Sequence, residues 1–446
     1  MRLLFTFFIT FPIFAQVETS DFYPSSPEQF YASIDKIIQH KIDTYQGNYK
    51  KQQSEIWEEK KEEIIKEIKS GDYIFNDSLH YYLRQIALPI YQKNPEIDGS
   101  GFQFFIKRSP VPNAASLGNG IFIINSGLFS LVENDDELAF IICHEIAHFH
   151  LKHSDVSLEE FFNSYESKET KSKIDAIAKE NEGRFSKALD LLKDINYSLR
   201  KKSRSQEIEA DSLGLIYFLN TQYNKAAAKQ VLSKLDFEEE AILNKEVLLK
   251  KHLTTQGYPF KDAWLVKETG SLFDIDEASN DYAFDKDSTK THPAIPKRVK
   301  ILSGKIPGND NSIRKNFVGS LKEIGLAKTI EGAIAFNELD IALYYLLTSF
   351  EEEKIPASLF YSNTSVVLKK LYELKKDHSV GRYIPPISPF SDEEQLNKIR
   401  TFIAHLEPKN IRKLGYWFCL EHKEQFNSKE EYNAVFNFFE ALNSKN

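Results

Sequence analysis

Hydrophobic residues along most of the chain recur every three or four positions, which is the spacing of one face of an α-helix. Residues 135–153 show this pattern with Leu138, Ile141, Ile142, Ile146 and Leu151. Asn134 and Glu137 stand where a capping box would place them at the start of a helix. The pattern therefore predicts a helix over residues 135–153 that buries one face and presents the other to a cleft.

Two short apolar runs predict strands rather than helices. Phe102–Ile106 and Ile121–Ile124 are both rich in aromatic and β-branched residues and lie next to glycines. We expect them to pair into a small sheet beside the 135–153 helix. Because helical spacing dominates elsewhere, the predicted fold class is α+β and predominantly α-helical, with a helical C-terminal region.

The Pro- and Gly-containing segment Pro307–Ser312 is the clearest domain boundary. It separates an expected catalytic part, residues 16–306 with a helical N-terminal portion, from a helical region at 313–446. The apolar pattern is periodic at Ala333–Phe350, but no sustained repeat follows. The C-terminal helices could bind a protein partner or could only pack on the rest of the chain, and the pattern does not separate these alternatives.

The first fifteen residues have the form of a secretory signal. Arg2 precedes a short apolar run, and Ala15 precedes Gln16, so we expect cleavage after Ala15 and an exported protein, periplasmic or extracellular. An uncleaved N-terminal anchor is the alternative. No later run reaches the length of a membrane helix, so no integral span is expected after cleavage.

Composition excludes one class of partner. The 446 residues carry a net charge of −8 with a pI near 5.9, and lysines and glutamates are interleaved, so we expect no nucleic-acid binding. The 41% of hydrophobic residues suffices for two or three cores. Cys143 and Cys419 are expected to stay unpaired.

The strongest chemical signal is the pentapeptide His-Glu-Ile-Ala-His at residues 144–148. His144 and His148 are four positions apart, so on a helix they share a face and can bind one metal ion. Glu145 lies about 100° round the helix, where its carboxylate can take a proton from the attacking water instead of binding the metal. This arrangement predicts a zinc hydrolase with one zinc ion per chain.

A second segment, Glu-Ile-Glu-Ala-Asp at residues 207–211, adds a candidate for the third metal ligand. Glu207, Asp211 and Gly214 share a helix face, and the glycine would let another helix approach closely. A catalytic zinc needs three protein ligands, and Glu207 is the expected third. Asp211 is suited to accept the free ring N–H of a ligating histidine.

A third segment, His-Pro-Ala-Ile-Pro-Lys-Arg at residues 292–298, adds a histidine at the start of a predicted helix. His292 could stabilise the oxyanion or occupy the open zinc position. Arg298 could hold a carboxylate of the site bidentately.

Together these three segments, in this order, resemble the zinc metallopeptidase family that includes HtpX, the CAAX prenyl proteases and the BepA-type enzymes. The resemblance extends over residues 70–304, including the approach Asn113–Leu128. It implies a zincin-like fold, zinc ligands at His144, His148 and Glu207, a general base at Glu145, and a catalytic or gating His292.

The resemblance also implies that a strand near Gly120–Ile124 binds extended substrate along its edge, with contacts at Asn119, Gly120, Ile121 and Phe122. Asn119 stands where family members often have Pro or Gly. Edge pairing is tolerant of side chains, so it suits unfolded or extended polypeptide.

Two functional classes remain open at this stage. One is a zinc metalloendopeptidase acting on exported or misfolded proteins, a role in protein quality control that the soluble branch of the family suggests. The other is a chaperone-like or scaffold protein, in which the C-terminal helices act and the zinc site is silent or masked by His292.

Overall fold

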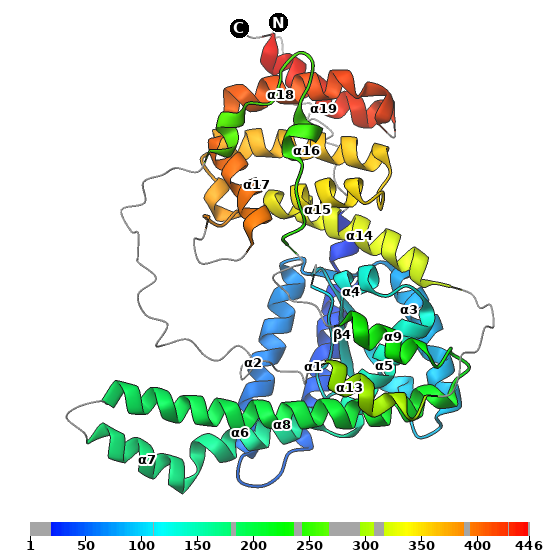
Figure 1. Ribbon diagram of the computed structural model, residues 1–446, viewed down its shortest axis with the longest axis vertical. Helices are drawn as coiled ribbons and strands as arrows, with labels where there is room; N and C mark the ends of the chain where they lie inside the picture. The colour runs from blue at the N-terminus through cyan, green and yellow to red at the C-terminus, as the bar shows by residue number, and fades with distance from the viewer. Residues whose placement is uncertain are drawn as a thin grey trace, which may run out of the picture. The chain divides into compact units, whose positions relative to one another are not determined.

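The computed structural model describes residues 19–109, 111–179, 184–235, 243–266, 295–306, 316–387, 393–426 and 428–444. By packing, the chain divides into a larger unit, Ser20–Glu239 with Gly270–Thr329, and a smaller unit that includes Glu240–Thr269 and Ile330–Asn446 (Figure 1). Residues 243–266, which the predicted boundary at Pro307–Ser312 groups with the catalytic part, pack with the C-terminal helices. The expected signal segment, residues 1–15, lies outside the described residues.

The larger unit contains one four-stranded sheet with the order β1-β2-β4-β3. Its strands are β1 (Tyr73–Ile74), β2 (Gln103–Lys107), β3 (Ala114–Ser116) and β4 (Ile121–Asn125). β2 and β4 run parallel, with Phe104 opposite Phe122, while β1 and β3 are antiparallel to their neighbours. The predicted pairing of the two apolar runs is confirmed.

Helices make up the rest of the larger unit. They are α1 (Pro27–Asp43), α2 (Lys50–Lys69), α3 (Asp77–Lys93), α4 (Ser126–Leu131), α5 (Asp135–His150), α6 (His153–Glu166), α7 (Lys168–Ala178), α8 (Arg184–Asn220), α9 (Ala227–Lys234), α13 (Ile295–Ser303) and the start of α14 (Val318–Ala335). The α1–α2 hairpin packs Ile38 and Trp57 into the same core as Phe105 of β2 and Ile121 of β4. Helix α5 packs against α3, α8 and α9.

Helix α5 begins where the sequence predicts and ends three residues earlier. Asn134 Oδ1 accepts a hydrogen bond from the Glu137 backbone N–H (3.0 Å), and the Glu137 carboxylate accepts one from the N–H of Glu133 (2.8 Å). After His150, Lys152 adopts a left-handed conformation with φ 54°, which ends the helix. A new helix, α6, therefore starts at His153, inside the range predicted for α5.

The smaller unit consists of α11 (Leu249–Leu253), α15 (Leu339–Glu351), α16 (Ala357–Lys376), α17 (Glu394–His405), α18 (Pro408–Glu421) and α19 (Lys429–Asn443). Helix α15 packs on α16 and α17, and α16 packs on α18 and α19. The periodic run at residues 333–350 is interrupted at Asn337, whose φ of 64° separates α14 from α15.

The fold class is α+β and mostly helical, as predicted. Among the described residues, no helix is both long and apolar enough to cross a membrane. Cys143 and Cys419 are both buried and unpaired, as expected.

Candidate metal centre

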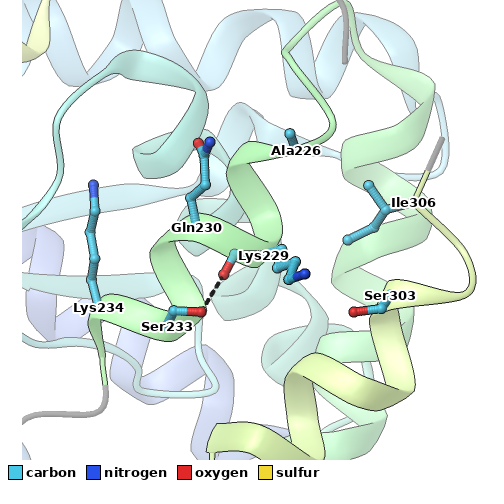
Figure 2. A pocket seen from close by; sticks show the side chains of 7 residues that line it. All are labelled: Ala226, Lys229, Gln230, Ser233, Lys234, Ser303 and Ile306. Carbon is cyan, nitrogen blue, oxygen red and sulfur yellow. Dashed lines mark hydrogen bonds between the residues drawn. The ribbon is translucent and has the colours of Figure 1, made fainter. Parts of the chain in front are cut away.

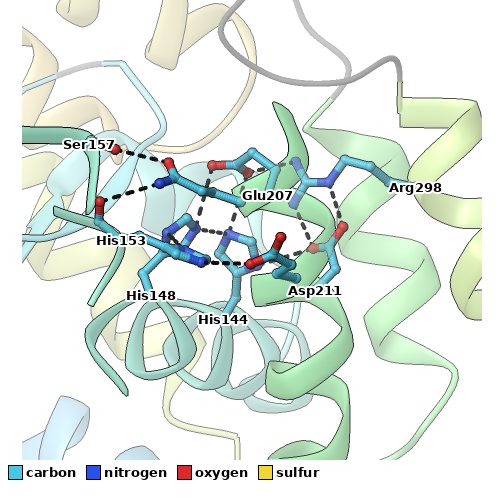
Figure 3. Close-up of polar contacts among 9 residues, drawn as sticks. His144, His148, His153, Ser157, Glu207, Asp211 and Arg298 are labelled. Carbon is cyan, nitrogen blue, oxygen red and sulfur yellow. Dashed lines mark hydrogen bonds and ion pairs between the residues drawn. The ribbon is translucent and has the colours of Figure 1, made fainter. Parts of the chain in front are cut away.

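Three side chains converge between α5 and α8. His144 and His148 project from α5 and Glu207 from α8, and one potential ligand atom from each lies within 4.8 Å of the others (Figure 3). The two Nε2 atoms are 3.1 Å apart. His144 Nε2 is 3.5 Å from Glu207 Oε2, and His148 Nε2 is 3.4 Å from Glu207 Oε1. The structure therefore brings together the three residues predicted as ligands.

These separations fit a zinc ion. A tetrahedral zinc with bonds of about 2.0–2.1 Å places its ligand atoms about 3.3–3.4 Å apart, close to the three separations in this cluster. Two imidazole nitrogens and one carboxylate oxygen also form a donor set typical of catalytic zinc, which keeps a fourth position for water or substrate. The residues thus fit zinc in both geometry and chemistry.

Gly214 allows α8 to approach α5 this closely. A Cβ atom added at Gly214 would lie 2.9 Å from the Cα and 3.0 Å from the backbone nitrogen of His144. Any larger side chain would push the helices apart, and with them Glu207 from the two histidines. The close approach expected from the sequence is present.

Asp211 and Arg298 form a second layer behind the ligands. Asp211 Oδ1 lies 3.1 Å from His144 Nδ1, and Arg298 of α13 donates to both Asp211 oxygens, each at 2.7 Å. Arg298 Nη1 is also 3.4 Å from Glu207 Oε2. Since Asp211 is 1% and Arg298 4% exposed, this is a buried ion pair. Arg298 thus holds a carboxylate of the site with two hydrogen bonds, and Asp211 lies at ion-pair distance from His144 Nδ1.

The charges of this layer set the protonation of His144. Burial alone would lower the pKa of His144, but Asp211 and Glu207 outweigh it and raise the pKa to about 10. Burial would raise the pKa of Asp211, yet Arg298 and His144 hold it below its usual value. Metal binding must therefore displace a proton from His144.

Glu145 lies beside the ligands on α5 and is half-buried. Among the described residues, no hydrogen bond or ion pair occupies its carboxylate. Its charge acts on Arg298, which places it near the ligand cluster, and its role as the base stays a prediction.

His153 is a residue of the site that the sequence interpretation placed wrongly. At the C-terminal end of the predicted 135–153 helix it would lie off the metal face and interact with the helix dipole. Instead its Nδ1 lies 2.9 Å from Nδ1 of His148, and its Nε2 lies 3.4 Å from Glu209 Oε2. The cause is the left-handed Lys152, which turns the chain back toward the ligands. His150 does lie off the metal face, and its Nδ1 contacts the hydroxyl of Tyr217 at 2.7 Å.

The predicted substrate strand also needs correction. β4 is paired on one side with β2 and on the other with β3, and Ile121 and Phe122 are 0% and 1% exposed. Substrate cannot pair with the edge of this strand, because both its edges are taken. Asn119 and Gly120 form the preceding turn, in which Asn119 Oδ1 accepts from Ile121 N (3.1 Å) and Gly120 has a φ of 91°.

The open edge belongs to β3. Leu117 and Asn113 bond to β4 through their backbones, so by the alternation of an antiparallel pair Ala115 also faces β4. The backbone groups of Ala114 and Ser116 point the other way, where no strand among the described residues pairs with them. Because β3 also contacts α5, this edge lies on the side of the sheet next to the ligand helix.

His292 lies outside the described residues, so its predicted role is untested. A pocket between α9 and α13, lined by residues such as Lys229, Lys234 and Ser303, contains none of the predicted site residues (Figure 2). Lys234 there is paired with Glu137.

Comparison with known proteins agrees with this geometry. A search of curated proteins finds no match to the chain. The model of Peptidase family M48 matches residues 78–306, which include α5, α8, α13 and the whole ligand cluster. Because the match covers more than half of the 446 residues, the chain belongs to this family of metallopeptidases, peptidase family M48.

Proposed function

We propose that the protein is an exported zinc endopeptidase that cleaves unfolded or extended polypeptide. The observation that carries the proposal is the convergence of His144, His148 and Glu207 beside a half-buried Glu145 without a bonded partner among the described residues. Export is inferred from the signal-like pattern of residues 1–15, and a role in quality control of exported or outer-membrane proteins from the family resemblance.

In the proposed mechanism the metal, the base and the residues behind the ligands have separate roles. When bound, zinc supplies Lewis acidity toward the scissile carbonyl and the attacking water. Glu145 takes the proton from that water and returns it to the leaving amine. Asp211 and Arg298 hold His144 and Glu207 in the orientation that the ion requires.

The edge of β3 suits an extended substrate. A peptide that adds to this edge would form backbone hydrogen bonds with Ala114 and Ser116. The side chains at the edge are small, so pairing there places few demands on the substrate's sequence. This supports unfolded polypeptide as the substrate class.

The proposal is tested with the full chain and an unfolded substrate such as casein, with and without a zinc chelator. Wild-type protein should cleave casein, and the chelator should abolish cleavage. Glu145→Gln should lose hydrolysis while keeping its zinc, because Glu145 is the base and not a ligand. Glu159→Gln, which changes an exposed carboxylate on α6, is the matched control and should stay active.

The same experiment identifies the alternative. If the wild-type protein binds zinc and casein but cleaves nothing, the peptidase proposal is wrong and the chaperone-like function takes its place. Loss of zinc from Glu145→Gln would overturn its role as base. Glu207→Ala should lower the zinc content. His292→Ala distinguishes its two predicted roles, because activity should rise if His292 masks the zinc and fall if it stabilises the oxyanion.

A further inference from the structure

The two ligating histidines have different partners behind them. His144 faces the carboxylate of Asp211, the usual kind of partner for a zinc ligand. His148 faces another histidine, His153, at 2.9 Å between their Nδ1 atoms. The motif and the family assignment give no role to His153.

We propose that His153 is a positioning residue for the zinc ligand His148, which it holds in the metal-binding tautomer. The inference rests on the proposed zinc site but not on the proposed hydrolysis. His148 presents Nε2 to the cluster, so a neutral, metal-bound ring carries its proton on Nδ1. At 2.9 Å that N–H needs an acceptor, and the only atom His153 offers there is an unprotonated Nδ1.

This fixes the second ring as well. With Nδ1 as an acceptor, neutral His153 carries its proton on Nε2, which points to Glu209 Oε2 at 3.4 Å. The hydrogen bonds are thus donated in one direction, from His148 to His153 (Figure 3) and from His153 to Glu209. Glu209 is about half exposed, so it adds less than His153 does.

The backbone that carries His153 is held from several sides. Gln206 Nε2 donates to the carbonyl of His153 (3.4 Å), and Gln206 Oε1 accepts from Ser157 Oγ (3.0 Å). Two positions on, Asp155 accepts from Lys41 Nζ and from the hydroxyl of Tyr45, both at 2.7 Å. The first turn of α6 is therefore anchored to α8 and to α1. His153 itself is 5% exposed. A rigid, buried placement is what a positioning residue requires.

Two substitutions separate this role from plain packing. The side-chain oxygen of asparagine can occupy the place of Nδ1, whereas glutamine carries its amide to the place of Nε2. His153→Asn should therefore keep zinc affinity within about threefold of wild type. His153→Gln should lose about 10- to 100-fold, the usual effect of removing such a partner.

Zinc affinity is measured by chelator competition on the full chain, and the unfolding midpoint of each variant is measured without zinc. His150→Gln is the matched control, because His150 lies on α5 with His148 but contacts Tyr217. The zinc affinity of this variant should not change. Equal losses in the Asn and Gln variants, or no loss in Gln, would overturn the proposal. Since the readout is metal affinity, a failure of hydrolysis would not be mistaken for a failure of this inference.

A second measurement needs no variant. In zinc-loaded wild-type protein with 15N-labelled histidines, His153 should show an unprotonated Nδ1 and a protonated Nε2. A proton on Nδ1 of His153 would overturn the proposal even if every variant failed to fold.

Discussion

Replacing Arg298 by methionine tests whether the second layer holds the metal centre together. Arg298 donates two hydrogen bonds of 2.7 Å to Asp211 and is only 4% exposed. Arg298→Met keeps most of the side-chain volume but leaves a buried carboxylate without its main cation. Removing one partner of a buried pair costs about 3–5 kcal/mol, so we expect a loss of that size in the free energy of unfolding.

The sign of the pH dependence follows from the pKa of Asp211. In the wild type this pKa lies below its usual value, so Asp211 contributes stability above the unfolded pKa that is lost as the pH falls through the folded one. Without Arg298, only His144 opposes the effect of burial on Asp211, so the folded pKa rises. The deficit of the variant should therefore be largest near neutral pH and should shrink below about pH 4, near the pKa of an unperturbed aspartate.

Urea unfolding of the metal-free full chain at several pH values measures this deficit. Lys300→Met changes an exposed cation on the same helix and is the control. Adding Asp211→Asn to Arg298→Met should restore part of the stability, because the carboxylate that Arg298 paired with is then replaced by a neutral amide. A loss below about 1 kcal/mol, or a deficit that grows toward acid pH, would refute this account of the ion pair.

Three further predictions concern the approach of the helices, the substrate edge and the metal. Gly214→Ala should destabilise the protein by about 1–3 kcal/mol and weaken zinc binding, because the added Cβ would meet the backbone of His144. Alanine has the better helix propensity, so unchanged unfolding and an unchanged zinc titration would contradict this prediction. Ala114→Pro should raise KM for casein and leave the zinc content unchanged, since it removes an N–H that points away from β4. Ala115→Pro should instead destabilise the sheet. If the two variants had the same effects on KM and on unfolding, substrate pairing at this edge would be contradicted. Chelation should lower the unfolding midpoint, and zinc at about 1,000 times its Kd should restore about 4 kcal/mol; a midpoint independent of zinc would mean that the ligands hold no metal.

The parts of the site that sequence predicts are those encoded by spacing within one helix. His144 and His148 share a face because they are four positions apart, and Glu207, Asp211 and Gly214 share another because they follow at intervals of four and three. Spacing alone does not predict that these two helix faces pack against each other. Gly214 gave a hint of this packing, since a glycine inside a helix is unfavourable unless something approaches closely.

His153 could not be found in this way because its position depends on one backbone angle. Apolar spacing continues through Leu151, so the pattern gives no reason to end the helix at His150. Lys152 at φ 54° ends it, and lysine carries no marked preference for that conformation. Likewise, β3 is three residues long without an apolar pattern, so the sequence could not reveal that β4 is covered on both edges.

The difference between the two histidine partners bears on the chemistry of the ion. Glu207 and Asp211 place two negative charges near the zinc site, and Arg298 places one positive charge there. A carboxylate behind His148 would add a third negative charge and weaken the electrophilic character of zinc toward a carbonyl. A neutral His153 fixes the tautomer of His148 by hydrogen bonding alone, so the geometry of the ligand is secured without further charge. Glu145, the group that the proposed reaction needs as its base, then acts beside a cluster whose charge His153 has not increased.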